Sequence, residues 1–340
     1  MARGKGVAVA LAMALALLGS GCASSARSTN RPSGASGATP SFGPVPSQQP
    51  TRPPLSQPTL EPGVLASIPL EGGPLTVATG LGSVWVASHR GFDVYRVDPT
   101  TNKVVATIDT GQESCGTPGL GFGKVWVAGC GPGDIAVIDA STNQIAGRLQ
   151  EGGLEVGFGA GSVWCSTLTG GIARIDPTTL RVQATIEVDG NVTFGGGAAW
   201  VAISNGTVSR IDPGTDRAVK TVPAGESGGD GSLLWFADGK VWAYPASGSG
   251  DSASVIDPRS NAVHQVSLHP LSVSNSTFTV GLGDVWVRGL ADQVARFDEA
   301  TGRRTASLPA DTSTSGFIAL GFDSLWETNL DTNTLWRVRI

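Results

Sequence analysis

The sequence is poor in the side chains that build most enzyme active sites and nucleic-acid-binding surfaces. Its 340 residues include three histidines, four cysteines and two tyrosines, and charged residues make up only 15% of the chain. The net charge is −5, and lysine and arginine form no run or stripe, which argues against binding to nucleic acid or to an anionic lipid surface. The scarcity of histidine also leaves little for general acid–base catalysis.

Long apolar runs are missing as well. The most apolar stretch, residues 7–18, is shorter than the about 20 residues that a transmembrane helix needs. It follows the basic residues Arg3 and Lys5. Together with Leu18–Cys22 it resembles a bacterial lipoprotein signal, in which the cysteine is lipid-modified and becomes the mature N-terminus. This resemblance implies lipidation of Cys22, although Gly19 stands where the usual motif has leucine. An ordinary secretory signal peptide is the alternative.

The next segment lacks the aliphatic side chains that a folded domain requires. From Ala23 to Pro62 the chain is mainly Ser, Pro, Gly, Thr and Gln, which cannot bury enough surface to offset the entropy of ordering. We therefore predict a signal peptide at residues 1–21 and a lipid anchor with a disordered tether at residues 22–63. A random chain of about 40 residues spans on the order of 35 Å. The remaining chain is expected on the extracytoplasmic side of a bacterial cell membrane.

What the sequence does contain is abundant glycine, with 48 residues, and a tryptophan that recurs seven times. The intervals between successive tryptophans are 41, 38, 36, 42, 44 and 40 residues, for Trp85, Trp126, Trp164, Trp200, Trp242, Trp286 and Trp326. A period near forty in β-rich units is typical of a β-propeller, whose blades bury their faces against one another. Residues 64–340 are therefore predicted to form an all-β, seven-bladed β-propeller.

Each repeat contains four short apolar runs separated by turn residues. In the first repeat these lie at residues 75–78, 84–87, 94–97 and 104–108, which predicts a four-stranded antiparallel blade. Because side chains alternate along a strand, we expect Trp85 to face one neighbouring blade, and Val84 and Val86 the other. The seventh repeat has only three such runs, whereas residues 64–71 have the pattern of a fourth. The N-terminal strand should therefore complete the last blade and close the ring.

Two polar residues also recur with the repeat. An aspartate usually followed by proline occupies one turn position, at Asp98, Asp139, Asp176, Asp212, Asp257 and Asp298. We interpret it as an Asx-turn residue and not as a metal ligand, because its carboxylate can accept backbone N–H groups within the turn. An arginine associated with the same motif is expected to form ion pairs on the outer strands, at Arg96, Arg174, Arg210, Arg296 and Arg337.

Residues 64–340 resemble YVTN-type β-propellers and the related propeller repeats of streptogramin B lyase-like proteins. The resemblance lies in recurring G-x-G-x-V-W-V-A and R-I-D-P-x-T-x-x-V-x-x-T-I elements, which Ala160–Trp164, Arg174–Thr179 and Arg210–Thr215 illustrate. It implies the fold. Activity does not follow from it, because propellers of this type serve in binding, in scaffolding and in several enzymatic reactions.

The connections between strands fall into two groups, which a meander places on opposite faces. The turns between first and second and between third and fourth strands are alike in every repeat, and we name their side the uniform face. The variable face carries the divergent connections, at residues 88–93, 110–118, 166–171, 225–230, 247–252, 269–276 and 329–333. A ligand is expected at the variable face, near the mouth of the central channel.

Several polar residues are candidates for that ligand surface: His89, Arg90, Gln112, Glu113, Glu155, Glu226, Asp230, Arg288 and Asp311. Glu155 opens an innermost strand and should lie near the channel, as either a solvated carboxylate or a ligand contact. Arg288 and Glu327 replace small or apolar residues just after their repeat tryptophan. We expect them to form a structural ion pair.

The cysteines and one serine motif need separate interpretation. Counting outward from the hairpin near Phe122 places Cys115 opposite Cys130 on adjacent strands, which predicts a disulfide after local adjustment. Cys165 follows a repeat tryptophan and is predicted to be a buried free thiol. Residues 225–229 match G-x-S-x-G but join two strands, so they lack the strand-to-helix setting of a serine hydrolase.

Two functions fit these features. The first is a non-enzymatic, lipid-anchored monomer that binds an envelope protein, a glycan or a small molecule and needs no cofactor. The second, implied by the resemblance, is a metal-dependent lyase that would hold a divalent cation with His89 or His269 beside Glu155, Glu226 or Asp230. No matched histidine motif carries over to this chain. A quinone-dependent dehydrogenase is a third option, for which we find no Ca²⁺ ligands.

Overall fold

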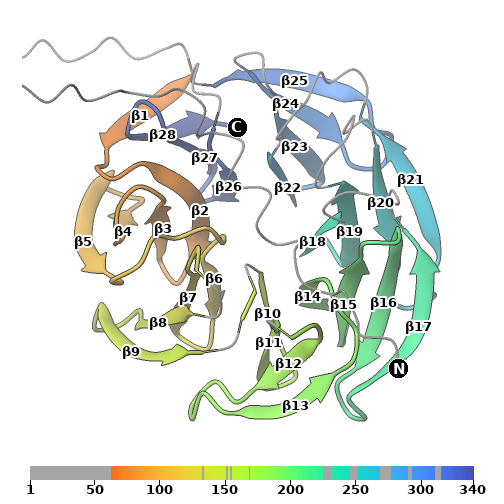
Figure 1. Cartoon of the computed structure of the whole chain (residues 1–340). Helices are drawn as coiled ribbons and strands as arrows, with labels where there is room; N and C mark the ends of the chain where they lie inside the picture. The colour runs from red at the N-terminus through yellow and green to blue at the C-terminus, as the bar shows by residue number, and fades with distance from the viewer. Residues whose placement is uncertain are drawn as a thin grey trace, which may run out of the picture. The chain divides into compact units, whose positions relative to one another are not determined.

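Seven four-stranded antiparallel sheets stand around a ring in the computed structural model (Figure 1). The structure describes residues 63–131, 134–150, 152–153, 155–167, 169–224, 232–245, 252–268, 277–289, 293–310 and 315–340. The seven-bladed propeller predicted from the tryptophan period is thus confirmed. No helix in these ranges has the length and apolarity needed to cross a membrane. The predicted signal peptide, Cys22 and nearly all of the predicted tether lie outside the described residues.

Four consecutive strands form each of blades one to six, from the innermost to the outermost. Blades one to three contain β2 (Pro74–Gly80), β3 (Ser83–Ser88), β4 (Asp93–Asp98), β5 (Lys103–Asp109), β6 (Gly119–Gly121), β7 (Lys124–Ala128), β8 (Ile135–Asp139), β9 (Gln144–Leu149), β10 (Val156–Gly159), β11 (Ser162–Ser166), β12 (Ile172–Ile175) and β13 (Val182–Ile186). Blades four to six contain β14 (Asn191–Gly195), β15 (Ala198–Ile203), β16 (Thr207–Asp212), β17 (Arg217–Pro223), β18 (Ser232–Ala237), β19 (Lys240–Pro245), β20 (Ser252–Ile256), β21 (Val263–Ser267), β22 (Thr277–Gly281), β23 (Asp284–Arg288), β24 (Gln293–Asp298) and β25 (Arg304–Pro309).

The seventh blade draws its strands from both ends of the propeller sequence. It contains β26 (Ile318–Gly321), β27 (Ser324–Asn329), β28 (Thr334–Arg339) and, as its outermost strand, β1 (Val64–Pro69). The antiparallel register runs from Val64 opposite Val338 to Pro69 opposite Thr334. The N-terminal strand therefore closes the ring, as its sequence pattern predicts.

The repeat tryptophans lie at the interfaces between blades, and all seven are fully buried. Trp85 packs with Val125 and Val127 of the next blade, whereas Val84 and Val86 pack with Trp326 of the preceding one. This confirms the predicted alternation. In six blades the indole Nε1 also donates to the carbonyl of the residue five positions earlier, a glycine at the end of the innermost strand.

That glycine is required by the neighbouring blade. An added Cβ at Gly159 would lie 1.9 Å from the ring of Phe194, and one at Gly195 would lie 1.9 Å from the ring of Phe236. A side chain near the end of one innermost strand thus fills the space left open by the glycine of the preceding blade. Blade five alone has Ala237 at this position, and there the next blade supplies the smaller Val280 to the shared core.

The aspartate turns form as predicted, and their backbone contacts favour the ionised carboxylate. Asp176 accepts the N–H groups of Thr178 and Thr179 at 2.9 and 2.7 Å, and these bonds hold its pKa below the usual value. Equivalent turn bonds lower the pKa of Asp98, Asp139, Asp257 and Asp298. These carboxylates therefore serve to stabilise the turns by accepting hydrogen bonds within them.

The prediction of ion pairs for the recurring arginines holds for Arg174 and Arg296 and, among the described residues, is wrong for the other three. All five lie on the third strands, directly opposite the repeat tryptophans, so the guanidinium stacks on the indole at 4.9–5.5 Å for Arg96, Arg210, Arg296 and Arg337. Arg96 also donates to Ala140 O and Asn143 Oδ1 in the next blade. Ion pairs occur for Arg174, with Asp216, and for Arg296, with Asp284.

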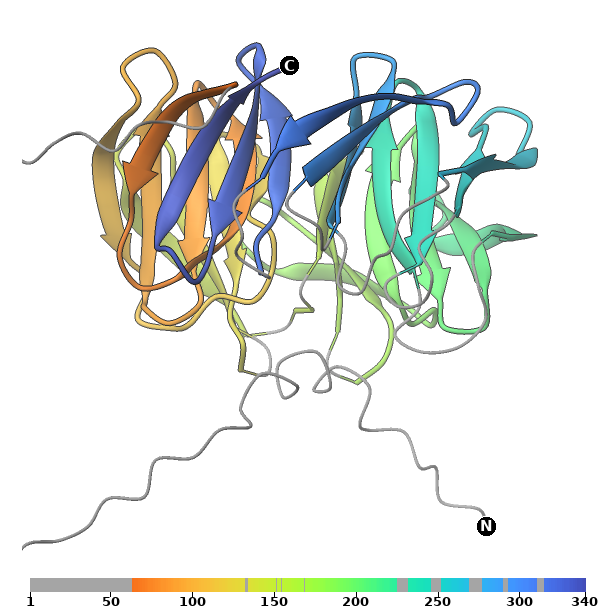
Figure 2. The same cartoon turned by 90° about the horizontal axis from the view of Figure 1, so that it is seen from above.

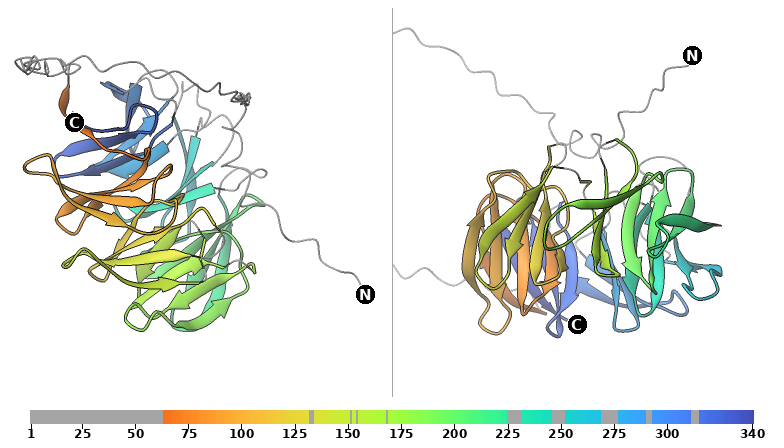
Figure 3. Two further views of the ribbon diagram at one scale, coloured as in Figure 1. Left: turned by 60° about the vertical axis from the view of Figure 1, so that its left-hand side comes forward. Right: turned by 90° about the horizontal axis from the view of Figure 1, so that it is seen from below.

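The two faces separate clearly when the ring is seen edge on (Figure 2). The uniform face carries the short turns and the C-terminal end of β28, and the variable face lies on the opposite side. Figure 3 shows the same ring from a further side and from below. Because β1 runs antiparallel to β28, its first residue also lies at the uniform face, where Arg339 N donates to Gly63 O at 3.0 Å.

Candidate functional site at the variable face

The structure describes only part of the predicted ligand surface. The connections of blades one to three carry the described candidates His89, Arg90, Gln112, Glu113 and Glu155, and Arg288 ends β23 of blade six. Glu226, Asp230, His269 and Asp311 lie outside the described residues, as does the G-x-S-x-G segment at 225–229.

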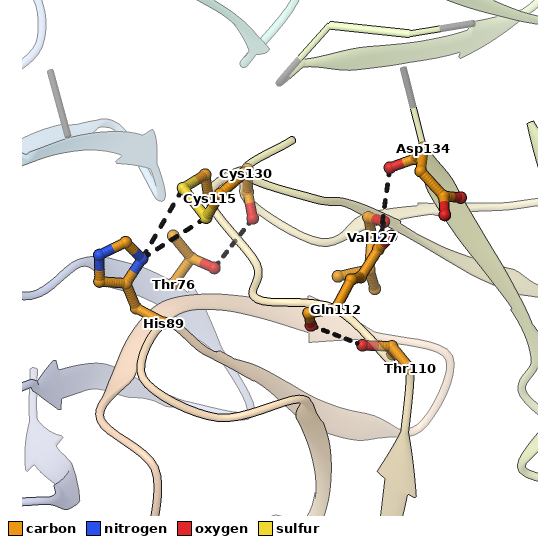
Figure 4. The surroundings of a disulfide bond; sticks show 9 residues. Thr76, His89, Thr110, Gln112, Cys115, Val127, Cys130 and Asp134 are labelled. Carbon is orange, nitrogen blue, oxygen red and sulfur yellow. Dashed lines mark hydrogen bonds between the residues drawn. A yellow bond between two sulfur atoms is a disulfide. The ribbon is translucent and has the colours of Figure 1, made fainter. Parts of the chain in front are cut away.

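A disulfide joins Cys115 to Cys130 at the entrance to blade two (Figure 4). The two Cα atoms are 4.9 Å apart, and the segments are held together by Cys115 N donating to Ala128 O and Cys130 N donating to Glu113 O. The ladder of the hairpin thus extends past the formal ends of β6 and β7. Cys165 is buried in β11.

His89 follows β3 and lies against this disulfide. Its Nδ1 is 3.7 Å from the sulfur of Cys115 and 3.6 Å from that of Cys130. The backbone of His89 is fixed by donation to Gly73 O at 2.9 Å, and Thr76 Oγ1 donates to Gly116 O at 3.0 Å. Loops of blades one and two are therefore joined tightly around the imidazole.

Within the described part of the chain, His89, Cys115 and Cys130 form a group of possible metal ligands, because their ligand atoms lie within 4.8 Å of one another. Two sulfurs bound in a disulfide do not offer thiolates, so the imidazole is the remaining donor in this state. No carboxylate joins His89 in a metal-sharing group among the described residues. Among the described residues, the donor set expected of the lyase hypothesis is therefore not assembled around His89, and Glu226, Asp230 and His269 lie outside them.

The side chain of Gln112 contacts neighbouring backbone groups and so supports its loop more than it offers a ligand contact at the surface. Its Nε2 lies 3.4 Å from Val127 O and 3.3 Å from Asp134 O, and its side chain covers Gly129, where a Cβ would meet it at 2.9 Å. Glu113 beside it is exposed. Gln112 thus anchors the connection that presents Glu113 to solvent.

Arg90 reaches across the closure of the ring. Its guanidinium forms an ion pair at 3.2 Å with Asp331, which follows β27 in blade seven, and both side chains remain about half exposed. The backbone beside it is held by Gly73 N donating to Asn333 Oδ1 at 3.0 Å. The variable-face loops of blades seven and one are therefore linked by charge and by hydrogen bonds.

Glu155 stands immediately before β10, the innermost strand of blade three, one residue ahead of the strand that it was predicted to open. It forms no hydrogen bond or ion pair with any residue that the structure describes, and desolvation raises its pKa to about 7. A carboxyl group of this kind exchanges a proton near neutral pH. It could act as an acid, a base or a protonated hydrogen-bond donor to a ligand.

Arg288 and Glu327 form a buried ion pair between blades six and seven. Arg288 Nε donates to Glu327 Oε1 at 2.7 Å, with side-chain exposures of 6% and 0%, and Arg288 Nη2 donates to Asn329 Oδ1 at 3.2 Å. The sequence analysis paired the two charges but missed Asn329. Because Asn329 lies two residues beyond Glu327, on the same face of the strand, its position could have identified it. The contacts assign the trio a role in joining two blades.

Comparison with known proteins establishes the fold. No protein-family model and no curated protein matches the sequence. A streptogramin B lyase structure aligns with a TM-score of 0.65 at 14% identity, covering 81% of this chain and 96% of that chain. A computationally designed protein, Ika8, aligns with a TM-score of 0.62 at 13% identity, covering 82% and 100%. At these identities the similarity to streptogramin B lyase is one of propeller architecture.

Proposed function

We propose that this chain is a lipid-anchored, extracytoplasmic binding or scaffold module of a bacterial envelope, which engages its ligand through the variable face. The observation that carries the proposal is the fixed loop surface over blades seven, one and two. There the Cys115–Cys130 disulfide, the His89 contacts and the Arg90–Asp331 ion pair hold loops from three blades in place. Such pre-organisation reduces the entropy lost when a partner binds.

The exposed chemistry of that surface favours a polar partner. Arg90, Glu113 and Asp331 offer charges of both signs to solvent, and His89 is partly exposed between them. An envelope protein or a glycan matches such a surface through hydrogen bonds and paired charges. The proposed anchor at Cys22 keeps the protein at the membrane without a spanning segment.

A photocrosslinking experiment in the native envelope tests this proposal. A photoreactive amino acid replaces Glu113 on the variable face or, as a control, the exposed Val219 on the outer strand β17. We expect a discrete crosslinked product from position 113 and none from position 219, and Arg90→Glu should reduce its yield. Equal products from both positions, or a yield unaffected by Arg90→Glu, would refute binding through this surface.

The anchor is tested separately by metabolic labelling with a fatty-acid analogue. We expect the full chain to become labelled and to remain in the membrane fraction, and Cys22→Ser to lose both properties. A labelled Cys22→Ser chain, or an unlabelled chain released from the membrane by signal cleavage, would contradict lipidation at this residue.

The alternative is a metal-dependent lyase at the same face, which the similarity of architecture to streptogramin B lyase favours. Against it stands the absence of a carboxylate in the metal-sharing group around His89 within the described residues. Calorimetric titration of the full chain with Mg²⁺, Mn²⁺ and Zn²⁺ distinguishes the two functions. Stoichiometric binding that is abolished by His89→Ala would replace the binding-module proposal with the lyase.

A further inference from the structure

On the uniform face, the first residue of the turn between the first and second strands changes in character around the ring. In blades three, four and five this residue is small or polar, namely Ala160, Gly196 and Asp238. In the four successive blades six, seven, one and two it is large and apolar, namely Leu282, Phe322, Leu81 and Phe122. We name these four residues the apolar arc.

The turn does not favour the residues of the apolar arc. Their φ angles are 62°, 55°, 51° and 56°, in the left-handed region, where a side chain on Cβ clashes with the backbone. Turns of this kind prefer Asn, Asp or Gly at that position. Blades four and five, with Gly196 and Asp238, follow the preference. The local structure therefore gives no reason for leucine or phenylalanine.

Packing accounts for these residues only in part: the ring of Phe122 meets that of Phe158 edge-on at 6.3 Å, but each side chain of the arc keeps more than a third of its surface in solvent. Leu282 is 69% exposed, Phe122 44%, Leu81 39% and Phe322 36%. Phe236 at the end of β18 is also exposed near this face, as are Leu65, Val104, Ile145 and Val182 at the starts of outermost strands. A strained backbone and exposed apolar surface recurring in four adjacent blades indicate a contact surface.

The position of the arc around the ring indicates what it contacts. Blade seven lies within the arc, and β1, its outermost strand, begins at the uniform face beside the end of β28. The chain that leads back to Cys22 therefore joins the propeller within the arc and on the same face. About 40 intervening residues reach on the order of 35 Å as a random chain, which keeps this part of the ring near the anchor.

We propose that the apolar arc rests on the lipid bilayer that holds the proposed lipid of Cys22, with Leu81, Phe122, Leu282 and Phe322 inserted at the level of the headgroups. This rests on the proposed anchor and gives the anchored propeller an orientation. Leucine and phenylalanine gain free energy from such partial insertion, and the tether confines the ring near the surface so that four side chains suffice. The variable face is then turned away from the membrane, toward its ligand.

The test uses the full, lipid-modified chain in phosphatidylcholine vesicles that contain a lipid with a photoactivatable diazirine. Flotation of the vesicles reports the anchor, and mass spectrometry of the labelled peptides reports which face meets lipid. The arc variant combines Leu81→Asn, Phe122→Asn, Leu282→Asn and Phe322→Asn. Because asparagine suits the left-handed turn position, this variant should fold with a higher midpoint of thermal unfolding than the wild type.

We expect lipid label at the four turns in the wild type and about tenfold less in the arc variant, the ratio that corresponds to about 1.4 kcal/mol. The control variant Val105→Asn/Val219→Asn removes two apolar side chains that are 55% and 54% exposed on outer strands, and it should label like the wild type. A floating chain labelled on the variable face, labelled evenly, or crosslinked to a second copy through the arc overturns this proposal and leaves the anchor standing. A wild-type chain that does not float overturns the anchor and the arc together.

Discussion

The seven repeat tryptophans share their burial but differ in one hydrogen bond. Trp200 Nε1 donates to Gly195 O at 3.0 Å, whereas Trp242 Nε1 is buried with no hydrogen-bond partner among the described residues. An indole N–H without a partner carries its full desolvation penalty. The position five residues earlier is Ala237 in this blade, where the other six have glycine. Blade five is thus the repeat whose tryptophan contributes least beyond its packing.

Replacing Trp200 or Trp242 by phenylalanine should separate the stability contributed by the indole hydrogen bond from that contributed by packing. Both substitutions remove similar buried area, but Trp200→Phe also leaves the carbonyl of Gly195 without its donor. We expect Trp200→Phe to lower the free energy of unfolding by about 2 kcal/mol more than Trp242→Phe. Urea titrations followed by circular dichroism measure the difference. Equal losses would mean that the indole hydrogen bonds contribute nothing to stability.

Glu155 makes stability depend on pH with a defined sign. Its pKa rises from 4.5 to about 7 on folding, so between these values the unfolded chain is ionised while the folded chain keeps the proton. Stability therefore falls as pH rises through this window, and the loss is complete above pH 7. Glu155→Gln should raise the free energy of unfolding by on the order of 2 kcal/mol at pH 8 and leave it unchanged at pH 4. A gain of equal size at both pH values would contradict the assigned cause.

At the scale of the element, equivalent residues of neighbouring second strands meet around the ring, and between blades six and seven both of them are charged. The second residue after a repeat tryptophan meets the first residue after the next one, as Ala87 meets Val127 and Ala128 meets Cys165 in shared apolar clusters. Between blades six and seven, Arg288 and Glu327 occupy these positions. A buried ion pair there replaces the apolar contact seen between blades one and two and between blades two and three.

This buried ion pair predicts non-additive mutations. Arg288→Ala leaves the carboxylate of Glu327 in a dry interface without its arginine and should cost about 3–5 kcal/mol. The double variant Arg288→Ala/Glu327→Val restores an apolar pair like that of Ala87 and Val127, and it should recover most of that loss. Urea unfolding of both single variants and of the double variant completes the cycle. A double variant as unstable as Arg288→Ala would assign the loss to the void and not to the charge.

Element-level features were predictable wherever the repeat supplied a comparison. The tryptophan period fixed the number of blades, and departures from the repeat singled out Arg288 and Glu327 as partners. Three of the recurring arginines were misassigned because no sequence pattern shows that the third-strand register places Arg96 over the indole of Trp85. The raised pKa of Glu155 depends on neighbours brought together by the fold. The apolar arc was overlooked because these turns look alike from repeat to repeat. Their φ angles and the exposure of their side chains cannot be read from the sequence.

At the scale of the whole molecule, stability depends on how the ring is closed. Blade seven meets blade one through side-chain packing, hydrogen bonds and the Arg90–Asp331 ion pair, and the chain crosses this interface only where β1 leads into β2. In β1, Ile68 is 5% exposed and packs in the cluster that contains Trp326 and Leu335. The outermost strand of blade seven therefore acts as a staple between the two ends of the propeller. In every other blade the outermost strand follows the third strand directly in sequence, whereas β1 is held to β28 without a chain connection.

A matched pair of substitutions isolates this closure. Ile186 is also 5% exposed and occupies the position equivalent to Ile68 on β13, the outermost strand of blade three. Ile68→Asp and Ile186→Asp each bury a carboxylate beside one outer strand, and each should destabilise its own strand by about 3 kcal/mol or more. Their consequences should differ in extent, because β13 stays tethered at both ends whereas β1 is free to leave with the segment that precedes it.

Hydrogen exchange followed by mass spectrometry measures that extent. In Ile68→Asp we expect loss of protection in β1 and also in β26, β27, β28 and β2, since an open ring exposes the edge of β28 and loosens the interface between blades seven and one. In Ile186→Asp the loss should stay within β12 and β13. The exposed edge should also make Ile68→Asp the more prone to self-association. Equal, local losses of protection in the two variants would mean that the ring is held by interblade packing alone and that β1 contributes no more than any other outer strand.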